Sequence, residues 1–203
     1  VEIDDDADPA RVFSTANEIH IPVGVPVHFT LTSPDVIHSF WIPALGGKTD
    51  VIPGRANQMW LEADKPGVYR GQCSEYCGLE HAQMALYVIA EPKAQFEAWR
   101  AAQQVPAVAP ATNVLAADRG RFVEHCGKCH SVRGTPATGT KGPDLTHLMS
   151  RSTIAAGMLD NNIGNLSGWI AHPQGIKPGS LMPDIPLSGP ELQSILAYVE
   201  TLK

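Results

Sequence analysis

The sequence predicts two domains, an all-β sandwich followed by an all-helical domain. Apolar residues alternate without a break over residues 19–31, which is the period of a half-buried strand. A Pro/Ala stretch at 105–113 is typical of a semi-extended linker. The 203 residues suffice for two domains of about 100 residues each. We therefore place the domains at 1–104 and 114–203, on either side of the linker.

The first domain is expected to contain short strands and to end in a helix. Pro22 and Pro26 fall on the polar side of the alternating segment and cannot donate to a β-ladder, so this part should lie at a sheet edge. Turn signals separate further short apolar segments at Met59–Leu61, Val68–Tyr69 and Met84–Ile89. Residues 93–104 lack Gly and Pro and place Phe96 and Trp99 on one face, which predicts a closing helix.

The second domain is expected to begin and end with a helix. Residues 115–126 can form the first helix, and a Gly/Pro-rich middle follows. Ser188-Gly-Pro-Glu191 is a capping box that starts the last helix. The apolar stripe of that helix consists of Leu192, Ile195, Leu196, Val199 and Leu202. We expect Gly120, Phe122 and Tyr198 to pack the two terminal helices together.

Charge and hydropathy restrict the partners. Residues 1–104 carry 14 acidic and 7 basic side chains, whereas residues 105–203 carry 7 acidic and 8 basic ones. The acidic first half should attract a basic partner and argues against nucleic acid. The longest apolar run, Met84–Ala90, is far shorter than the roughly 18 residues of a membrane helix. Because the sequence starts at Val1 without a Met or a signal-peptide pattern, we expect that its natural N-terminus was removed and that membrane attachment requires a missing N-terminal anchor.

A cluster of metal-binding residue types lies late in the first domain. Cys73, Cys77, His81 and Met84 supply two thiols, an imidazole and a thioether. This soft set suits copper rather than magnesium or calcium. The ligand atoms can converge if the segment forms a loop between two strands. His38, which follows the alternating segment, is the best candidate for a further imidazole.

Two alternatives stand beside a copper site. Cys73 and Cys77 could form a disulfide, or both could hold a tetrahedral zinc ion with His81 and His38. Met84 favours copper, because a thioether has no usual place in a structural zinc site. Taken alone, Met84 would be interpreted as a core residue.

A second motif, Cys126-Gly-Lys-Cys129-His130, has the pattern of covalent c-type haem attachment. The cysteines would form thioethers to the porphyrin, and His130 would be the proximal axial ligand. The sixth ligand must come from farther along the chain, where the candidates are Met149, Met158 and Met182. We choose Met182, because a loop just before the last helix can fold over the open haem face. A thioredoxin-like redox pair and a zinc site are the alternatives for this motif.

The other histidines and the tryptophans are not expected to be ligands. His20 and His28 lie on the polar side of the alternating segment and are interpreted as surface residues. Surface or propionate-side positions are expected for His125, His147 and His172. Trp41 and Trp60 are interpreted as core or interface aromatics.

Residues 15–92 resemble the dicopper (CuA) domain of cytochrome c oxidase subunit II, a cupredoxin-like sandwich. The resemblance rests on Cys73-Ser-Glu-Tyr-Cys77-Gly, His81 and Met84, with His38 upstream and Asp50-Val-Ile-Pro-Gly-Arg55 between them. It implies that both thiolates bridge two coppers, that His38 and Met84 complete one copper, and that His81 and the backbone carbonyl of Glu75 complete the other. It also implies that the Glu75 carboxylate helps to hold Mg²⁺ at the junction with subunit I in the full complex.

Residues 114–203 resemble class I cytochrome c, a family that places its Met ligand in a loop like that of Met182. Pro143, in Lys141-Gly-Pro-Asp-Leu145, matches the position whose carbonyl accepts the Nδ1 hydrogen of the proximal histidine. In this resemblance, His130 and Met182 are the axial ligands, and such a haem transfers electrons without oxygen chemistry.

A dicopper domain fused to a cytochrome c is similar to subunit II of caa-type haem-copper oxidases. The resemblance implies an electron path from an external cytochrome or other donor to haem c, then to the dicopper centre, then to haem a in subunit I. The chain would be part of cytochrome c oxidase, with no catalytic residues of its own and no oxidase turnover in isolation. Covalent haem attachment implies the periplasm or the outer face of the cytoplasmic membrane. The alternative function is a non-enzymatic haem electron shuttle with a structural zinc or single-copper site.

Overall fold

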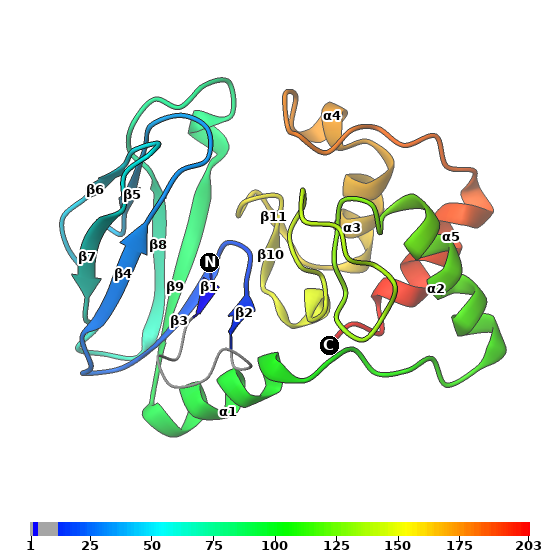
Figure 1. Cartoon of the computed structure of the whole chain (residues 1–203), viewed down its shortest axis with the longest axis horizontal. Coiled ribbons are helices and arrows are strands. Elements are labelled where there is room, and N and C mark those ends of the chain that lie inside the picture. The colour runs from blue at the N-terminus through cyan, green and yellow to red at the C-terminus, as the bar shows by residue number, and fades with distance from the viewer. Residues whose placement is uncertain (1, 4–11) are drawn as a thin grey trace. The chain divides into compact units, whose positions relative to one another are not determined.

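The computed structural model of the chain describes residues 2–3 and 12–203, which form two compact units (Figure 1). Residues 17–102 together with 156–158 make up a β-rich first unit, and the other described residues make up a helical second unit. The predicted fold class, a cupredoxin-like β domain followed by a helical domain, is confirmed. Among the described residues, none of the helices is long and apolar enough to cross a membrane.

The first unit combines a five-stranded sheet with a separate two-stranded ladder. The sheet has the order β3-β9-β8-β5-β6, with strands Glu18–Pro22 (β3), Ala85–Glu91 (β9), Gly67–Cys73 (β8), His38–Trp41 (β5) and Thr49–Val51 (β6). β3 pairs with β9 in parallel, whereas β9, β8, β5 and β6 pair antiparallel. The ladder pairs Val27–Leu31 (β4) with Asn57–Leu61 (β7). Side chains from both parts form the core: Ile19, Ile21, Ile42, Leu61, Ala63, Val88 and Ala90.

The alternating segment forms two strands rather than one. β3 ends at Pro22, residues 23–26 form the connection, and β4 begins at Val27. Gly24 has a φ of +69°, a left-handed conformation that favours glycine. β3 lies at the edge of the five-stranded sheet, as the prolines predict, whereas β4 belongs to the other ladder. The alternation continues through the turn because Ile21, before it, lies in the core and Val27, after it, packs against the same core.

The predicted closing helix is confirmed as α1, Lys93–Gln104. Its Trp99 stacks on the His20 ring with a centroid distance of 3.9 Å and an interplanar angle of 9°. His20 Nδ1 also lies 3.1 Å from a carboxylate oxygen of Glu91. The interpretation of His20 as a surface residue is therefore wrong, because α1 covers this side of β3. His28 on β4 is exposed, as predicted.

The second unit has a helix near each end of the 113–203 segment, α2 (Asn113–His125) and α5 (Gly189–Val199). Between them lie α3 (Ile163–Ala171), the short α4 (Pro173–Ile176) and a hairpin of Thr153–Ile154 (β10) and Leu159–Asp160 (β11). A 3₁₀ turn covers Leu148–Ser150. Glu2–Ile3 (β1) and Phe13–Ser14 (β2) form a small antiparallel ladder.

The two terminal helices of this segment pack through aromatic and aliphatic side chains. The rings of Phe122 and Tyr198 lie 5.2 Å apart, and both residues are buried. The predicted capping box at Ser188 and Glu191 is present. Gly120, by contrast, is exposed, and a Cβ placed there would meet no atom within 4 Å. Its expected packing role is therefore wrong, because this position of α2 faces solvent.

The segment that follows α1 is bound to the second unit. His147 Nε2 lies 2.9 Å from the carbonyl oxygen of Val105, and its Nδ1 lies 2.7 Å from that of Lys203. The amide of Ala107 donates to the carbonyl of Arg133 at 3.0 Å. His147 is only 7% exposed, so its predicted surface position is wrong: it joins three chain segments. The domain limits of 1–104 and 114–203, with a linker at 105–113, remain a prediction.

Candidate copper and haem sites

The predicted copper ligands lie at the ends of paired strands. β8 ends at Cys73 and β9 begins at Ala85, so the other ligands of this segment lie in the connection between two paired strands. The amide of Cys73 donates to the Met84 carbonyl at 3.0 Å, which closes this connection. The amide of Ser74 donates to the Ser39 carbonyl at 3.0 Å, which ties the same connection to β5. His38 is the first residue of β5, and the sheet therefore brings it to the cysteines.

The donor atoms converge around the two sulfur atoms. Cys73 Sγ lies 3.7 Å from Cys77 Sγ, 3.7 Å from His38 Nδ1 and 3.2 Å from the carbonyl oxygen of Glu75. Cys77 Sγ lies 3.7 Å from His81 Nδ1 and 3.9 Å from Met84 Sδ. The structure thus brings together all six donors that the sequence and the family resemblance predict.

This donor set fits copper. The two thiols are free and their sulfur atoms are 3.7 Å apart, well beyond the roughly 2.0 Å of a disulfide. The ligand atoms of His38, Cys73 and Cys77 all lie within 4.8 Å of one another. Two thiolates, two imidazole nitrogens, a thioether and a carbonyl are more donors than the four of a tetrahedral zinc site. Each sulfur contacts one imidazole and one weaker donor, an arrangement that two bridged metal ions can use.

The two thiols have different pKa values in the metal-free chain. Burial opposes ionisation of Cys73, but backbone groups at Ser39 and Glu75 and the imidazole of His38 outweigh it and lower its pKa to about 7. Burial raises the pKa of Cys77 to about 11, and the neighbouring sulfur of Cys73 adds to this effect. The lowered pKa of Cys73 favours the thiolate, which is the form that binds a metal ion.

A carboxylate outside the donor set holds His38. Asp35 Oδ1 lies 3.0 Å from His38 Nε2, and the Ser33 hydroxyl donates to the same oxygen at 2.8 Å. The hydrogen bond from Ser33, followed by the contact with His38, lowers the pKa of Asp35 to about 2. Burial opposes protonation of His38, yet its contacts with Asp35 and Cys73 raise its pKa. Because Asp35 takes the Nε2 hydrogen, Nδ1 stays available to a metal. The sequence analysis missed Asp35, although its place three residues before His38 offered a signal.

Two further side chains define the exposed side of this site. Glu75 and Tyr76 both belong to the 74–84 connection and are exposed. The ring of Tyr76 meets the His81 ring edge-on at a centroid distance of 5.7 Å. The Glu75 backbone carbonyl points to Cys73, so its exposed carboxylate is free for another role.

The haem motif begins where α2 ends. Cys126 is the C-cap of α2, and the amides of Cys129 and His130 both donate to its carbonyl, at 3.1 and 3.0 Å. This tight turn places the two thiols and the imidazole in one short segment. Burial raises the pKa of the Cys126 thiol to about 11.

The His130 ring is held in the orientation that an iron ligand needs. Its Nδ1 lies 2.9 Å from the carbonyl oxygen of Pro143, so Nδ1 donates and Nε2 remains available as a ligand. Burial lowers the pKa of His130, which favours the neutral ligating form. Gly142 lies against the ring, where a Cβ would come within 2.5 Å of it. A side chain at this position would therefore push the imidazole out of its present place. These contacts fit the haem-binding role that the motif predicts.

The three candidate methionines occupy different environments. Met149 packs against the apolar core of the second unit. Met158 lies in the connection between β10 and β11, which is grouped with the first unit. Met182 lies in the loop between α4 and α5, and neighbouring Leu181 is 97% exposed. Of the three, Met182 keeps the loop position that the sequence analysis favours.

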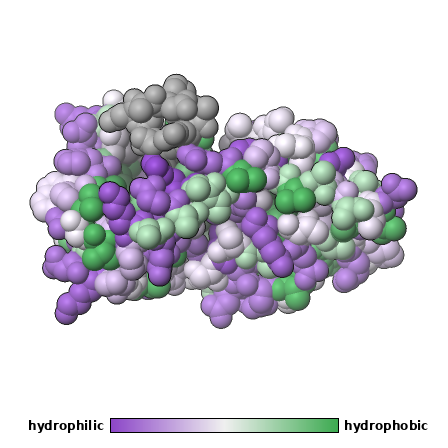
Figure 2. Space-filling view, turned by 90° about the horizontal axis from the view of Figure 1, so that it is seen from below, coloured by the Kyte–Doolittle hydropathy of each residue, from purple (hydrophilic) through white to green (hydrophobic). Residues whose placement is uncertain are grey.

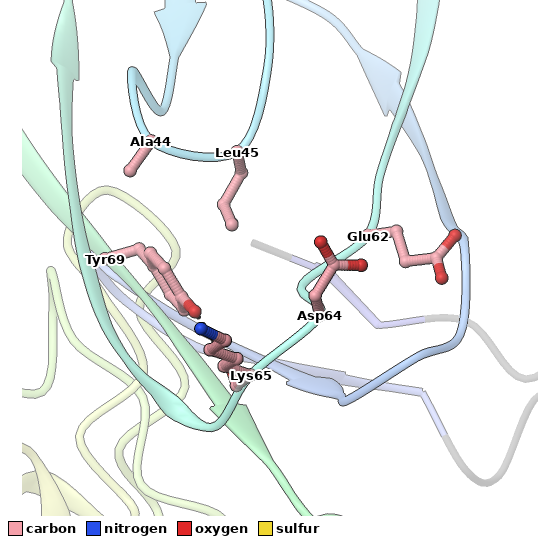
Figure 3. A pocket seen from close by; sticks show the side chains of 6 residues that line it. All are labelled: Ala44, Leu45, Glu62, Asp64, Lys65 and Tyr69. Atoms are coloured by element: carbon pink, nitrogen blue, oxygen red, sulfur yellow. Dashed lines mark hydrogen bonds between the residues drawn. The ribbon is translucent and has the colours of Figure 1, made fainter.

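Two surface pockets on the first unit contain none of these ligands. One, of about 220 Å³, is lined by Ala44, Leu45, Glu62, Asp64, Lys65 and Tyr69 (Figure 3). The other, of about 420 Å³, is lined in part by Lys48, Met59 and Trp60. Trp60 is 59% exposed and is therefore not a core residue. Hydrophilic and hydrophobic residues are interspersed on the face seen in Figure 2.

Comparison with known proteins gives a consistent assignment for both halves. Residues 2–91 match the family model "Cytochrome C oxidase subunit II, periplasmic domain", and residues 117–203 match the model "Cytochrome c". Cytochrome c oxidase subunit 2 of Alkalihalophilus pseudofirmus is 42% identical over 193 residues, which are 94% of this chain and 56% of that protein. The corresponding protein of Bacillus sp. strain PS3 is 34% identical over 201 residues, 93% of this chain and 56% of that protein.

A solved structure is also similar to the chain. The periplasmic domain of subunit II of the cytochrome oxidase of Bradyrhizobium japonicum is 38% identical, covering 49% of this chain and 71% of that one, with a TM-score of 0.43. The chain spans 56% of the length of the two curated relatives.

Proposed function

The chain belongs to the family of cytochrome c oxidase subunit II and joins its periplasmic domain to a cytochrome c domain; from this premise we propose that it is the electron-entry part of a haem-copper terminal oxidase. Relatives that match almost the whole chain are named as subunit 2 of that enzyme. Electrons would pass from an external cytochrome or other donor to haem c, then to a dicopper centre, and on to haem a in subunit I.

The convergence of six donors around two sulfur atoms is the observation that carries the dinuclear assignment. The two sulfurs of Cys73 and Cys77 lie 3.7 Å apart, and each has its own imidazole within 3.7 Å. Met84 and the Glu75 carbonyl provide a fifth and a sixth donor. In this proposal His38 and Met84 would hold one copper, His81 and the Glu75 carbonyl would hold the other, and both thiolates would serve the two ions. Each sulfur then contacts one ligand of each ion.

In the second domain, the chain's own residues would attach, orient and shield a haem. Cys126 and Cys129 would form the thioethers, and His130 and Met182 would occupy both axial positions of the iron. The Pro143 carbonyl holds the Nδ1 hydrogen of His130. Filling both axial positions with protein ligands would exclude external ligands, which suits a site that only transfers electrons.

The two loaded centres would supply one-electron transfer, and oxygen reduction would take place in another subunit. We propose that the chain alone accepts and passes electrons without oxidase turnover. The exposed carboxylate of Glu75 would help to hold Mg²⁺ at the junction with subunit I in the assembled enzyme. Measured oxygen consumption by the purified chain would contradict this division of roles.

Electron paramagnetic resonance on the oxidised, metal-loaded chain tests the proposal, with copper, zinc and iron determined on the same sample. We expect a hyperfine pattern from one electron shared over two coppers beside a low-spin haem signal. The competing function is a haem electron shuttle with a structural zinc or single-copper site. Zinc in the first domain, or a single-copper pattern, would favour that function instead.

A further inference from the structure

Residues 178–184, the part of the α4–α5 loop that carries Met182, include no buried residue. From Pro178 to Asp184 every residue is exposed or partly exposed, and Leu181, next to Met182, is 97% exposed. Gly179 has a φ of +94°, so the chain turns sharply through a conformation that favours glycine. Apolar burial therefore contributes little to the position of this loop. Polar contacts must supply most of its order.

One side chain, that of Gln174, supplies most of these contacts. Its Oε1 accepts from the Gly179 amide at 3.1 Å, and its Nε2 donates to the carbonyls of Ser180 and Met182, both at 2.7 Å. The Ser180 hydroxyl lies 3.1 Å from the same Nε2. An amide group has two N–H donors, so the two short bonds to carbonyls use both of them. The carboxamide of Gln174 thus pins three backbone groups within four residues of the loop.

The main chain of Gln174 also contacts the part of the loop that follows Met182. Gln174 follows Pro173 at the start of α4, where the helix leaves its first amides without intrahelical acceptors. The Gln174 amide donates to Asp184 Oδ1 at 3.2 Å. Pro173 is fully buried, so the base from which Gln174 reaches out is itself fixed in the unit. The residue therefore contacts the loop both before and after Met182.

We propose that Gln174 is a positioning residue for the sixth ligand of the haem iron: its carboxamide holds the 179–182 backbone so that the Met182 thioether stays on the metal. This inference rests on the proposed function, in which Met182 is that ligand. A thioether is a weak, neutral donor. A loop that moves freely would release it often, and external ligands would then reach the iron. Gln174 opposes this release through its hydrogen bonds to the loop backbone.

The test compares variants of the haem-loaded chain in the ferric state. Gln174→Ala removes all the side-chain bonds, whereas Gln174→Glu keeps size and the acceptor for Gly179 but loses both donors. Gln193→Ala, an exposed glutamine of α5, is the matched control, and Met182→Ala is the reference for complete ligand loss. The readouts are the Met-to-iron charge-transfer absorption, imidazole binding to the iron, and hydrogen exchange of the 179–184 amides. Covalent haem content and unfolding of the helical unit are followed in parallel.

We expect both Gln174 variants to bind imidazole about tenfold more readily than the parent chain, because two or more net hydrogen bonds are lost. The charge-transfer band should weaken and the loop amides should exchange faster, while haem content and the Gln193→Ala control stay unchanged. Should Gln174→Ala lose its haem, the Gln174→Glu variant decides the question.

Two outcomes would overturn the inference in distinguishable ways. If Met182→Ala differs from the parent but both Gln174 variants behave like the parent, Gln174 has no positioning role. If the parent already lacks the band and binds imidazole like Met182→Ala, then the assignment of Met182 in the proposed function is wrong, and the role of Gln174 fails with it.

Discussion

The copper-binding region and the haem-binding region hold their ligands by different means. In the first unit, the donors lie at strand ends or in a connection closed by backbone bonds at Cys73 and Ser74. In the second unit, His130 sits in a tight turn after α2, but Met182 lies in a loop segment, 178–184, with no buried residue. Backbone hydrogen bonds to the sheet therefore hold the ends of the segment that carries the first site. The second depends on a few side-chain contacts, so single substitutions away from the iron should affect it more.

The two regions nevertheless share one feature: a group outside the ligand set makes a hydrogen bond to a ligand and orients it. Asp35 does this for His38, and the Pro143 carbonyl does it for His130. Gln174 acts on the backbone around Met182 instead of on the ligand atom. An imidazole ligand has a second nitrogen that can make a hydrogen bond to a neighbour, whereas a thioether ligand has no second polar atom. This difference explains why the methionine is held through its loop.

The largest expected effect comes from Cys77→Ser, which tests whether the two units are independent. The substitution removes one of two shared thiolates, so we expect complete loss of the shared-copper signal in electron paramagnetic resonance. The low-spin haem signal should persist, because the two sites lie in separate units. Ser74→Ala, in the same connection, is the control and should retain the copper signal. Survival of the shared signal in Cys77→Ser would rule out a bridging role for this cysteine.

Met182→Ala should produce the next largest effect. It tests the haem site, whose proposed sixth ligand lies in a loop segment without buried residues. Loss of the thioether opens one axial position, so external ligands should bind and the haem potential should fall, within the roughly 0.8 V range that axial ligands span. Redox titration and cyanide binding measure both changes. Met149→Ala is the control: this residue packs against the core, so its loss should lower stability without changing iron ligation. An unchanged spectrum and potential in Met182→Ala would reassign the ligand.

Asp35→Ala tests whether the sheet alone is enough to position His38. Loss of the carboxylate frees the ring and its tautomer, so we expect copper affinity to fall about 10- to 100-fold. Competition with a chelator measures the change. Asp35→Asn keeps an oxygen acceptor for Nε2 and should restore most of the affinity, and Asp64→Ala serves as a distant acidic control. Equal affinities for Asp35→Ala and the parent would show that the strands suffice.

The smallest effect concerns the capping box of α5, which borders the Met182 loop. Hydrogen bonds from Ser188 lower the pKa of Glu191. A carboxylate with a lowered pKa stabilises the fold at neutral pH, and this contribution is lost as the pH falls through that value. Ser188→Ala removes the N-cap hydroxyl and should lower the free energy of unfolding by about 1 kcal/mol. It also removes a hydrogen bond to Glu191, so the free energy of unfolding should fall less steeply as the pH is lowered. Urea unfolding of the second unit at neutral and acid pH measures both. The same acid dependence in parent and variant would contradict this account.

Much of the fold could be predicted because its signals are local. The closing helix at 93–104, the edge position of β3 and the capped last helix follow from Gly/Pro absence, proline chemistry and a capping box. The turn at 23–26 could not be predicted from periodicity, since apolar residues before and after it reach the same core. His20 and His147 were misplaced because the groups that cover them come from distant parts of the chain.

By itself, the sequence determined which residue types are available for metal and haem chemistry. Two thiols, an imidazole and a thioether within twelve residues predict a soft-metal site, and a Cys-x-x-Cys-His motif after a helix predicts a haem site. Only the tertiary structure decided how the ligands are positioned and which further side chains hold them in place. The pairing of β5 with β8 brings His38 to Cys73, and the packing of α4 brings Gln174 to the Met182 loop. Ligand identity is a property of residue types, whereas ligand positioning depends on contacts between segments that chain order does not reveal.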